Sequence, residues 1–536
     1  MKTGIQTIIT FLYGDFSLDS RLRGNDGRKE IMQNYKFYLE KFGEYGEVTE
    51  IKHSLVVVEG LPNLRINEIV VFENGSFGQI TDISDSLCRV ALLKKSTQIK
   101  SGEKVSRTDG LFTVPVSEEF LGTMVDPMGK IIAPENKKIQ KVEYRSIETE
   151  IGGIDKRAKI DKQLLTGVTL VDMLLPLGNG QKELIIGDRK TGKTSFLLTT
   201  VRNQIKQKKI VIFATIGKKK TDIKKLYDYF VTEKLIDKMI FVVSCSDDSE
   251  NLIHLTPYTA MTMAEYFKDQ GVDTLVVLDD LSIHAKNYRE IAINSEKFPG
   301  RESYPGDIFY LHAHLLERAG NFRHSGKAEG RIQNRRLQIL ESSSPTPPQN
   351  DDYSTVSITC LPVAETIEGD LSGYITTNLM GITDGHIYFD RSIFTKGRRP
   401  AINLPLSVTR VGRQTQASIY QQANHKITAF LSEYESLQNL AHFGAELSPN
   451  VKRVITRGER IIQVFDQKYS EIISSEMQLI LLALAYSESF FDVDIKILKE
   501  KILKSDYKNL IKQIENIKTF TELLEYLGKN KKEFTS

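Results

Sequence analysis

The sequence predicts a multidomain chain with an N-terminal antiparallel β-barrel, a central α/β domain and a C-terminal α-helical bundle. Three successive patterns predict it: short β-branched runs between turn residues, then apolar runs that alternate with helical stretches, then helical spacing alone. A chain of 536 residues, 40% of them hydrophobic, accommodates such an arrangement, because domains average roughly 100–200 residues.

The first pattern runs from Gly46 to Val116. Its strand-like segments recur about every 8–12 residues with Gly, Pro, Asn or Asp between them, which is typical of a small antiparallel barrel or sandwich. We place the barrel domain at residues 45–116, after an N-terminal extension of residues 1–44. The segments are SLVVVEG, NEIVVF, GQITDIS, CRVALL, GEKVSRT and LFTVPV.

The second pattern covers residues 117–416, where apolar runs alternate with helical stretches. This alternation predicts a mainly parallel sheet with helices on both faces. Ligands of such sheets bind at the carboxyl ends of the strands. The expected strands are Glu183–Gly187, Lys209–Gly217, Met239–Ser244, Thr274–Asp280 and Ser357–Glu365.

The third pattern covers residues 417–536, where strand signals are absent. Apolar residues recur there at spacings of three and four, as at Ile495, Leu498 and Ile502. Such spacing places apolar side chains on one face of a helix. We therefore expect a C-terminal helical domain.

The charge balance indicates no particular partner. Lys and Arg number 72 against 69 Asp and Glu, a net charge of +3, so neither a basic field for nucleic acid nor an acidic excess is present. Three cysteines without a C-x-x-C pair argue against a disulfide framework or a zinc site and fit a reducing, cytoplasmic setting. The apolar runs are shorter than the ~18 residues that cross a bilayer, so we expect membrane contact only through partners.

The N-terminal segment stands apart from these patterns. Residues 1–31 hold one apolar patch, Ile5 to Tyr13, and lack the small-residue cleavage site of a secretory signal. The run GNDG is turn chemistry with no periodic apolar face after it, so we expect disorder up to about residue 31. Met32 is an alternative start, a hypothesis that the intact mass of the native protein tests.

The most specific local signal is the segment ELIIGDRKTGKTSF. A strand-like run, Glu183 to Ile186, precedes a G-x-x-x-x-G-K-[ST] motif, and the helical run SFLLTTVRNQI follows it. The glycines let backbone N–H groups point at phosphate oxygens, and the helix N-terminus adds partial positive charge. This predicts a P-loop (RecA-like) nucleotide-binding domain, against the alternative of a glycine-containing turn without function. The predicted binding residues are Gly187, Asp188, Arg189, Lys190, Thr191, Gly192, Lys193, Thr194 and Ser195.

A P-loop of this type implies ATP or ADP with Mg²⁺ as cofactors. Lys193 is expected to reach the β- and γ-phosphates, and Thr194 to bind Mg²⁺ through its hydroxyl. A second acidic group is needed at the end of a neighbouring strand, and TLVVLDD supplies one. We expect Asp279 to hold the metal through water and Asp280 to cap the following helix, with capping by both aspartates as the alternative.

The predicted site lacks a group that orients an attacking water molecule. The second strand, IVIFATIG, is followed by Lys218, Lys219 and Lys220, and an ammonium cannot act as a base while it is charged. Asp222 is close in sequence, yet we expect it to cap the helix DIKKLYDYFVTEKLI. The sequence therefore predicts a site that holds a nucleotide and cleaves it poorly.

Several long segments together resemble the alpha subunit of the F-type ATP synthase over roughly residues 40–530. The resemblance implies a barrel, a nucleotide-binding domain and a helical bundle, in agreement with the three patterns. It also implies a hexamer of alternating alpha and catalytic beta subunits around a gamma shaft, with delta and a peripheral stalk as further partners. The segments are LLTGVTLVDMLLPLGNGQKELIIGDRKTGKTS, LDDLSIHAKNYREI, PGRESYPGDIFYLHAHLLERAG, LPVAETIEGDLSGYITTN, ITDGHIYFDRSIFTKGRRPAINLPLSVTRVG and AHFGAEL.

The same resemblance implies a subunit of a rotary proton- or sodium-translocating synthase, an H⁺-transporting two-sector ATPase, at the cytoplasmic face of the bacterial inner membrane. Its own Mg-ATP site is non-catalytic and regulatory, and the chain alone is nearly inactive and binds no nucleic acid directly. Arg410 in LSVTRVG is implied to enter the catalytic site of the adjacent beta subunit, a kind of contact worth about 10³–10⁵ in rate. Phe394, Arg399 and Pro400 are implied to line the adenine pocket, and Glu365 to lie near Mg²⁺ and the phosphates.

The sequence departs from the family at several positions. Lys190 and Lys218 stand where glutamine is usual, and their ammonium groups are expected to attract phosphate. Gly381 replaces a serine that contacts the neighbouring catalytic site. Around Asp466-Gln467-Lys468 a glutamine pair near the adenine is replaced, which bears on base specificity.

An inserted loop at residues 321–354 replaces a short Gly-rich loop of the family. Its Arg, Ser and Pro content predicts disorder, with an RNA- or lipid-touching patch at RIQNRR as the alternative. Only Met32 to Phe42 remain for the helical arm that meets the stalk in the family. His312 and His314 form an H-x-H pair without an evident third ligand, which favours a structural role over metal binding.

Two other functions remain open at this stage. The first is a self-sufficient hexameric P-loop motor of the RNA translocase or export type, which needs a hydrolytic carboxylate after the second strand. The second is an assembly-only structural homologue, which Gly381 and the inserted loop suggest. ATPase assays of the chain alone, and of the chain with beta and gamma subunits, distinguish the three functions.

Overall fold

The computed structural model describes residues 34–52, 54–84, 86–94, 99–325, 353–441, 448–504 and 517–535. The predicted disorder of residues 1–31 and the hypothesis on Met32 lie outside these ranges, as do residues 326–352 of the inserted loop. The chain divides into two compact units. The first comprises residues up to Ala158, Lys209–Ala364 and Ser372–Ile382; the second comprises Lys159–Lys208, Glu365–Leu371 and residues from Thr383 on.

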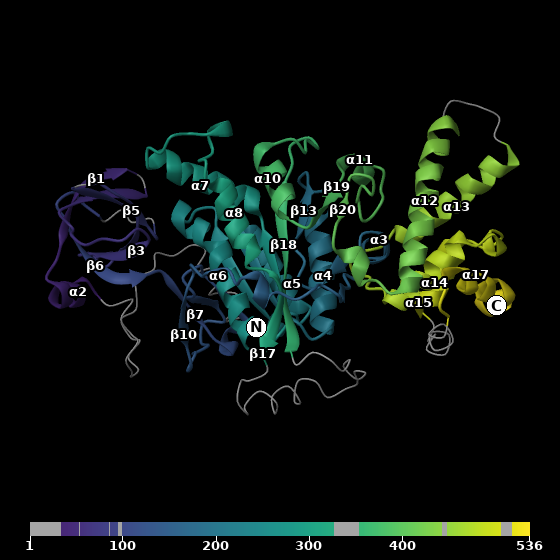
Figure 1. Ribbon diagram of the computed structural model, residues 1–536, viewed down its shortest axis with the longest axis horizontal. Coiled ribbons are helices and arrows are strands. Elements are labelled where there is room, and N and C mark those ends of the chain that lie inside the picture. The colour runs from purple at the N-terminus through teal and green to yellow at the C-terminus, as the bar shows by residue number, and fades with distance from the viewer. Residues whose placement is uncertain are drawn as a thin grey trace. The chain divides into compact units, whose positions relative to one another are not determined.

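A closed antiparallel barrel opens the first unit, drawn in purple and blue in Figure 1. Its strand order is β1-β2-β5-β4-β3-β6, which confirms the predicted barrel. The apolar run of β3 is buried along its whole length, whereas β4 alternates between buried and less buried positions over most of its length. The strands are β1 (Gly46–Lys52), β2 (Leu55–Glu59), β3 (Glu68–Phe72), β4 (Phe77–Ile83), β5 (Leu87–Leu92) and β6 (Lys104–Leu111).

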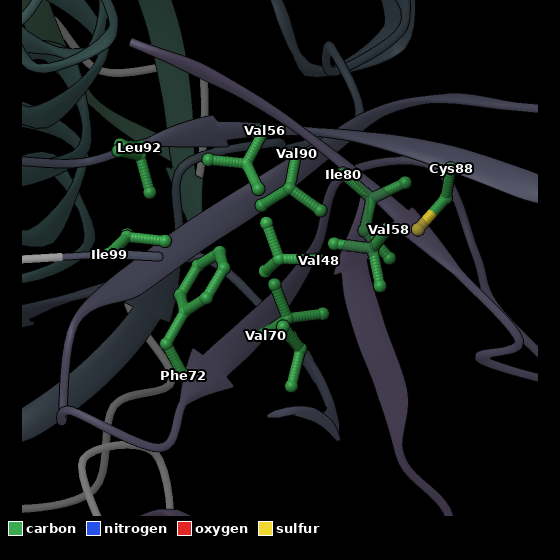
Figure 2. Packing of buried hydrophobic residues seen from close by; sticks show 11 residues of the cluster. Val48, Val56, Val58, Val70, Phe72, Ile80, Cys88, Val90, Leu92 and Ile99 are labelled. Carbon is green, nitrogen blue, oxygen red and sulfur yellow. The ribbon is translucent and has the colours of Figure 1, made fainter. Parts of the chain in front are cut away.

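The barrel interior is filled by β-branched and aromatic side chains (Figure 2). Val58, Val90 and Phe72 have no exposed surface, and Cys88 and Ile99 complete the cluster. Each fully buried side chain of the valine or phenylalanine type contributes roughly 1.5–3 kcal/mol. The alternating valines of the sequence thus account for this core.

A helix packs beside the barrel, and one predicted barrel strand lies outside it. Helix α2 (Tyr35–Phe42) begins after Asn34, whose side chain accepts from the Phe37 N–H, and packs Tyr38 against Val71. The segment LFTVPV is not a barrel strand, because β7 (Thr113–Val116) pairs with β10 (Glu143–Ser146) instead. The predicted barrel therefore closes with β6.

The first unit also holds a mainly parallel sheet in the order β18-β16-β14-β15-β8-β9. All residues of β15 and β16 are buried, as expected for inner parallel strands. Only β9 and the added strand β17 run antiparallel to their neighbours. The strands are β8 (Thr123–Val125), β9 (Ile131–Ala133), β14 (Ile210–Lys218), β15 (Met239–Cys245), β16 (Thr274–Asp279), β17 (Gly320–Ser325) and β18 (Tyr353–Glu365).

Strands β17 and β18 extend into both ends of the predicted inserted loop. Residues 321–325 and 353–354 pair with strand partners, with Asn321 opposite Ser357 and Ser325 opposite Tyr353. The prediction of disorder for residues 321–354 is therefore wrong at its two ends. Backbone hydrogen bonds hold these strand ends together. Such bonds do not require an apolar sequence pattern, and the prediction of disorder rested on the lack of one.

Helices flank the strands of the first unit. Helix α6 contacts β14, β15 and β16, and Ser249 caps it by accepting from the Leu252 N–H. Asp222 does not cap α5, because the cap position is Lys219 and Asp222 lies in the first turn. The helices are α5 (Lys220–Thr232), α6 (Glu250–Asp269), α7 (Leu281–Asn294), α8 (Ile308–Glu317) and α10 (Tyr374–Ile382).

The second unit combines a small sheet with a helical domain. Strands β13 (Glu183–Gly187) and β19 (Gly385–Phe389) are parallel, and β20 (Val408–Thr409) pairs with β19. Two-residue strands β11 (Gln163–Leu164) and β12 (Leu177–Gly178) form a separate pair. The helices are α3 (Thr169–Leu174), α4 (Lys193–Lys206), α11 (Arg391–Thr395), α12 (Ser418–Ala441), α13 (Pro449–Phe465), α14 (Ser475–Tyr486), α15 (Ile495–Lys504), α17 (Phe520–Lys529) and α18 (Lys531–Thr535).

Capping residues explain where helices of the C-terminal domain begin. Ser448 accepts from the Val451 N–H and Pro449 follows at the first helical position of α13. Thr519 and Glu522 form a reciprocal capping box at α17. The predicted C-terminal helical domain is confirmed. Within the residues that the structure describes, no helix is both long and apolar enough to span a bilayer.

Candidate functional site

The predicted P-loop connects β13 to α4 in the second unit. Gly187 has φ 150° and Gly192 has φ 101°, a backbone region that favours glycine. A Cβ atom at Gly187 would lie 2.3 Å from the carbonyl oxygen of Phe389 on the paired strand β19. A Cβ atom at Gly192 would meet no atom within 4 Å, so its glycine serves the turn and not the packing.

Lys193 folds back onto the loop that carries it. Its Nζ atom donates to the carbonyl oxygens of Gly187, at 2.5 Å, and Asp188, at 2.7 Å. The hydroxyl of Thr191 also donates to the Asp188 oxygen, at 2.8 Å. No side chain caps α4 at Gly192, so the helix N-terminus carries no anionic or polar cap of its own.

Two further contacts hold the loop from outside. Oδ1 of Asp188 accepts from the hydroxyl of Thr366, at 2.5 Å, and from the N–H of Gly369, at 2.9 Å. Arg189 Nε lies 2.7 Å from Oε2 of Glu365, which places Glu365 beside the loop. The side chains of Lys190, Thr194 and Ser195 are exposed.

The predicted adenine residues lie together at the end of α11. The Arg399 guanidinium is 3.6 Å from the centroid of the Phe394 ring, a cation–π contact. Arg399 Nη1 also donates to the Phe394 carbonyl oxygen, at 2.8 Å. Phe394, Arg399 and Pro400 are each partly exposed, so an aromatic ring and a guanidinium are accessible together.

Gln467 contacts this cluster through its backbone N–H, which donates to the Arg399 carbonyl oxygen at 2.7 Å, whereas its side-chain amide bonds to Gly167 and Thr169. Its Oε1 accepts from the N–H and the hydroxyl of Thr169, at 3.0 and 3.1 Å, and its Nε2 donates to the Gly167 carbonyl oxygen, at 2.7 Å. The side chain is buried. Gln467 therefore ties the loop before α3 to the helical domain.

Arg410 follows β20 and its side chain is exposed. Its N–H donates to the Asp384 carbonyl oxygen, at 3.0 Å. Nearby, burial raises the pKa of the Glu183 carboxyl well above its usual range, while a hydrogen bond from Gln181 and the charge of Arg410 act in the opposite direction. Arg410 thus combines a fixed backbone with an exposed guanidinium.

The acidic pair of TLVVLDD lies in the first unit. Asp280 caps α7 as predicted, accepting from the Ile283 N–H at 2.8 Å. Asp279 is ion-paired, because Lys218 Nζ lies 2.9 Å from its Oδ1. Since Asp279 and Thr194 belong to different units, their joint role at a metal remains a prediction.

His312 belongs to a buried histidine cluster in the first unit. Its Nε2 lies 3.1 Å from Nδ1 of His284, and His284 Nε2 lies 3.2 Å from the His254 carbonyl oxygen. Burial lowers the pKa of all three imidazoles, to about 3 for His254. Among the described residues, no group of three or more His, Cys, Asp or Glu could hold a metal ion.

Two contacts of these residues were missed by the sequence analysis. Thr366 and Gly369 hold Asp188 although they lie about 180 residues away, and no local pattern signals that pairing. The ion pair of Lys218 and Asp279 has a partial signal, because opposite charges follow two strands that the sequence predicts in one mainly parallel sheet; that the two strands are neighbours comes from the structure.

Comparisons with known proteins identify the family of both the P-loop segment and the helical domain. Residues 167–409 match the family model described as ATP synthase alpha/beta family, nucleotide-binding domain. Residues 416–533 match the model of the ATP synthase alpha/beta chain, C terminal domain. Both matches cover segments in which the P-loop and the helical domain lie.

Curated relatives match along most of the chain. ATP synthase subunit alpha of Ehrlichia ruminantium (strain Gardel) is 33% identical over 94% of this chain and 96% of its own length. The protein of the same name from Mycoplasma genitalium is 32% identical over 92% of both chains. That of Sulfurovum sp. (strain NBC37-1) is 36% identical over 82% of this chain and 81% of its own length.

Proposed function

The chain belongs to the alpha-subunit family of the F-type ATP synthase, and on this basis we propose that it binds ATP or ADP without hydrolysing it and lends Arg410 to a neighbouring catalytic site. Membership in this family implies ATP synthesis, nucleotide binding and ion transport by a complex to which the subunit is peripheral. The single observation that carries the proposal is the P-loop without a hydrolytic carboxylate after β14.

Phosphate binding is supported by the uncapped N-terminus of α4 and by the Lys193 ammonium. The N-terminus of α4 has no side-chain cap, and its N–H groups favour an anion. The Lys193 ammonium donates to two carbonyl oxygens of its own loop, those of Gly187 and Asp188. A phosphate oxygen is a stronger acceptor for an ammonium than a neutral carbonyl, so Lys193 is expected to turn to the nucleotide.

Poor hydrolysis is supported by the end of β14. Lys218 is paired with Asp279, and Lys220 lies 3.4 Å from Asp247. Asp222 lies in the first turn of α5, 3.9 Å from Lys225, with 55% of its side chain exposed. A general base must reach the water that attacks the γ-phosphate. We propose that none of these groups acts as that base.

The role of Arg410 is supported by its exposure and its anchored backbone. A guanidinium that reaches a partner's nucleotide must protrude from the surface of its own subunit, and its backbone must be held in a fixed position. The proposed partners are beta subunits in an alternating hexamer, the gamma shaft, delta and the peripheral stalk. The proposed location is the cytoplasmic face of the bacterial inner membrane, with protons or sodium ions as the coupling ion.

Mg²⁺ is the expected companion of the nucleotide, with Thr194 and Asp279 as its predicted contacts. Thr194 offers an exposed hydroxyl at the start of α4, which suits the role. Asp279 suits it less, because its carboxylate is already paired with an ammonium at 2.9 Å. Of the two predicted Mg²⁺ contacts, Thr194 therefore suits the metal better than Asp279 does.

Isothermal titration of the full chain with ATP tests nucleotide binding. Lys193→Ala is expected to weaken binding about tenfold or more, since it removes a charge-assisted hydrogen bond. Lys206→Ala is the matched control, because Lys206 is an exposed lysine at the other end of α4. Equal affinity of the two variants would contradict phosphate binding at the P-loop.

An ATPase assay of the same protein tests the absence of hydrolysis. The chain alone is expected to be nearly inactive, and activity is expected when beta and gamma subunits are added. Robust turnover by the chain alone would favour the self-sufficient motor. A complex that assembles without any turnover would favour the assembly-only homologue.

A further inference from the structure

The strand that leads into the P-loop begins beside the segment that carries Arg410. Within the second unit, three strands lie in the order β20-β19-β13. Glu183, the first residue of β13, is opposite Gly385 of β19, and Gly385 is opposite Thr409 of β20. Arg410 follows Thr409 directly. One row of residues across the sheet therefore connects the start of β13 with the neighbour of Arg410.

A glycine at the centre of this row leaves space above it. A Cβ atom at Gly385 would lie 2.7 Å from Oε2 and 2.9 Å from Oε1 of Glu183. Both distances are shorter than the roughly 3.5–4.0 Å of a favourable contact between non-bonded atoms. The absence of a side chain at Gly385 thus lets a third residue bridge the two outer members of the row.

Gln181 forms this bridge with its side-chain amide. Its Nε2 atom donates to Oε2 of Glu183, at 2.7 Å, and to the hydroxyl oxygen of Thr409, at 3.2 Å. Its Oε1 atom accepts from the Gly178 N–H, at 2.8 Å. Gln181 and Glu183 are 0% and 1% exposed. Both N–H donors of the amide are therefore used, in a place withdrawn from water.

The Thr409 hydroxyl uses its full hydrogen-bonding capacity. It donates to the Pro176 carbonyl oxygen, at 2.9 Å, and accepts from the Gln181 amide and from the Gly412 N–H, at 3.3 Å. A hydroxyl has one donor and two acceptor positions, so each position is occupied. Hydrogen bonds are stronger in a buried setting than in water, and these three fix the backbone next to Arg410.

The backbone of Arg410 itself is held from the same end of β13. Its N–H donates to the Asp384 carbonyl oxygen, at 3.0 Å. The Asp384 N–H donates to the Lys182 carbonyl oxygen, and Oδ2 of Asp384 accepts from the Lys182 N–H, both at 2.8 Å. Two routes, one through Thr409 and one through Asp384, therefore lead from Arg410 to residues 181–183.

The position of Arg410 matters because its proposed role is to stabilise charge in a neighbouring site. A misplacement of about 1 Å at such a group costs about 10²-fold in rate. The Arg410 side chain is exposed, so its own subunit controls its position through the backbone. The bonds of Thr409 act one residue away from that backbone.

We propose that Gln181 is a positioning residue for Arg410, which it holds in place through the hydroxyl of Thr409. This rests on the proposed role of Arg410 and adds the residues that set its position. Gln181 has no exposed surface, so it acts only through its neighbours. The effect is expected on the rate of the chemical step and not on the binding of ATP.

The test is the steady-state ATPase activity of the complex reconstituted with beta and gamma subunits. Thr409→Val removes the hydroxyl and is expected to lower kcat about tenfold or more, with the KM for ATP changed less than about twofold. Thr409→Ser keeps the hydroxyl and is the matched control, with kcat expected within about twofold of the unmodified complex. Gln181→Met, of similar length and without an amide, is expected to lower kcat as Thr409→Val does.

An Arg410→Ala background distinguishes positioning from general damage to the fold. If Thr409 acts through Arg410, adding Thr409→Val to Arg410→Ala is expected to change the residual rate less than about twofold. The same further loss in both backgrounds would overturn the proposal. So would an unchanged kcat for Thr409→Val or for Gln181→Met, or an equal loss for Thr409→Ser. Gln181→Asn, with an amide one methylene shorter, replaces Gln181→Met if circular dichroism shows that the latter does not fold.

The two proposals fail in different ways. If Arg410→Ala leaves the rate of an assembled complex unchanged, the role of Arg410 is wrong and the role of Gln181 is wrong with it. If Arg410→Ala lowers the rate but Gln181→Met and Thr409→Val do not, the role of Arg410 stands and that of Gln181 alone is wrong.

Discussion

The hydroxyl of Thr366 donates to Oδ1 of Asp188 over 2.5 Å, and this bond, within the second unit, joins the segment that follows β18 to the loop before α4. Asp188 is buried, and the Gly369 N–H is its other partner on the same oxygen. A buried carboxylate that loses a donor is left partly unsatisfied. The loop that is proposed to hold phosphate thus depends on a threonine outside the motif.

Thr366→Val is therefore expected to weaken ATP binding. It removes a hydrogen bond to a charged group, worth about 1.5–3 kcal/mol, and lets the loop move. The expected result is an affinity about tenfold lower by isothermal titration. Thr521→Val, at an exposed threonine of α17, is the control, and equal affinity of both variants would refute the role of Thr366.

The buried histidines predict a loss of stability in acid. Because burial lowers the pKa of His254, His284 and His312 in the folded chain, the unfolded chain binds more protons below about pH 6.5. Stability is then fully present above pH 6.5 and is lost as the pH falls toward about 3, the folded pKa of His254. Each imidazole contributes up to about 1.4 kcal/mol per pH unit in that range.

Urea unfolding between neutral and mildly acidic pH measures this slope. His254→Phe keeps an aromatic ring stacked on His284 and Tyr288 and removes one titrating group. Its free energy of unfolding is expected to fall less steeply with acid than that of the unmodified chain. An unchanged slope would show that folding does not lower the pKa of His254.

The buried Glu183 carboxyl makes stability depend on pH in the opposite direction to the histidines. Burial raises the pKa of its carboxyl, so the unfolded chain releases this proton first, and stability falls as the pH rises from about 4.3 through the folded pKa. Glu183→Gln keeps an acceptor for Gln181, which donates to Oε2 at 2.7 Å, and removes the charge.

The glutamine variant is expected to unfold at a higher temperature than the unmodified chain at pH 7, by a few degrees. Glu47→Gln removes a charge from an exposed residue of β1 and is expected to change the melting temperature little. A lower melting temperature for Glu183→Gln would mean that the carboxylate is ionised and needed in the folded chain.

Much of the fold follows from sequence pattern. The sequence predicts β13 at its observed residues and β14 shifted by one residue, because fully buried parallel strands are continuous apolar runs between turn residues. The strand GHIYF, β19, has a continuous apolar run of only Ile387 to Phe389 and is missed as a strand, although it pairs with β13 along its whole length. Pairing partners distant in sequence decide such short strands.

The site is less predictable than the fold. The P-loop backbone follows from two glycines and a helix start, which are local. The fixing of Asp188 by Thr366, and of Asp279 by Lys218, depends on which strand ends lie together and how their side chains turn. The wrong prediction for Asp222 has a local cause, since α5 begins two residues earlier, at Lys220.

The ATPase rate of the reconstituted complex that carries Arg410→Ala tests the central claim most directly. Arg413→Ala is its control, because Arg413 is an exposed arginine three residues along the same segment. The proposal predicts a rate lower by about 10³ or more for Arg410→Ala, with assembly intact and the control near the unmodified rate. An unchanged rate for Arg410→Ala in an assembled complex would contradict the claim that this chain lends its guanidinium to chemistry in a neighbouring subunit.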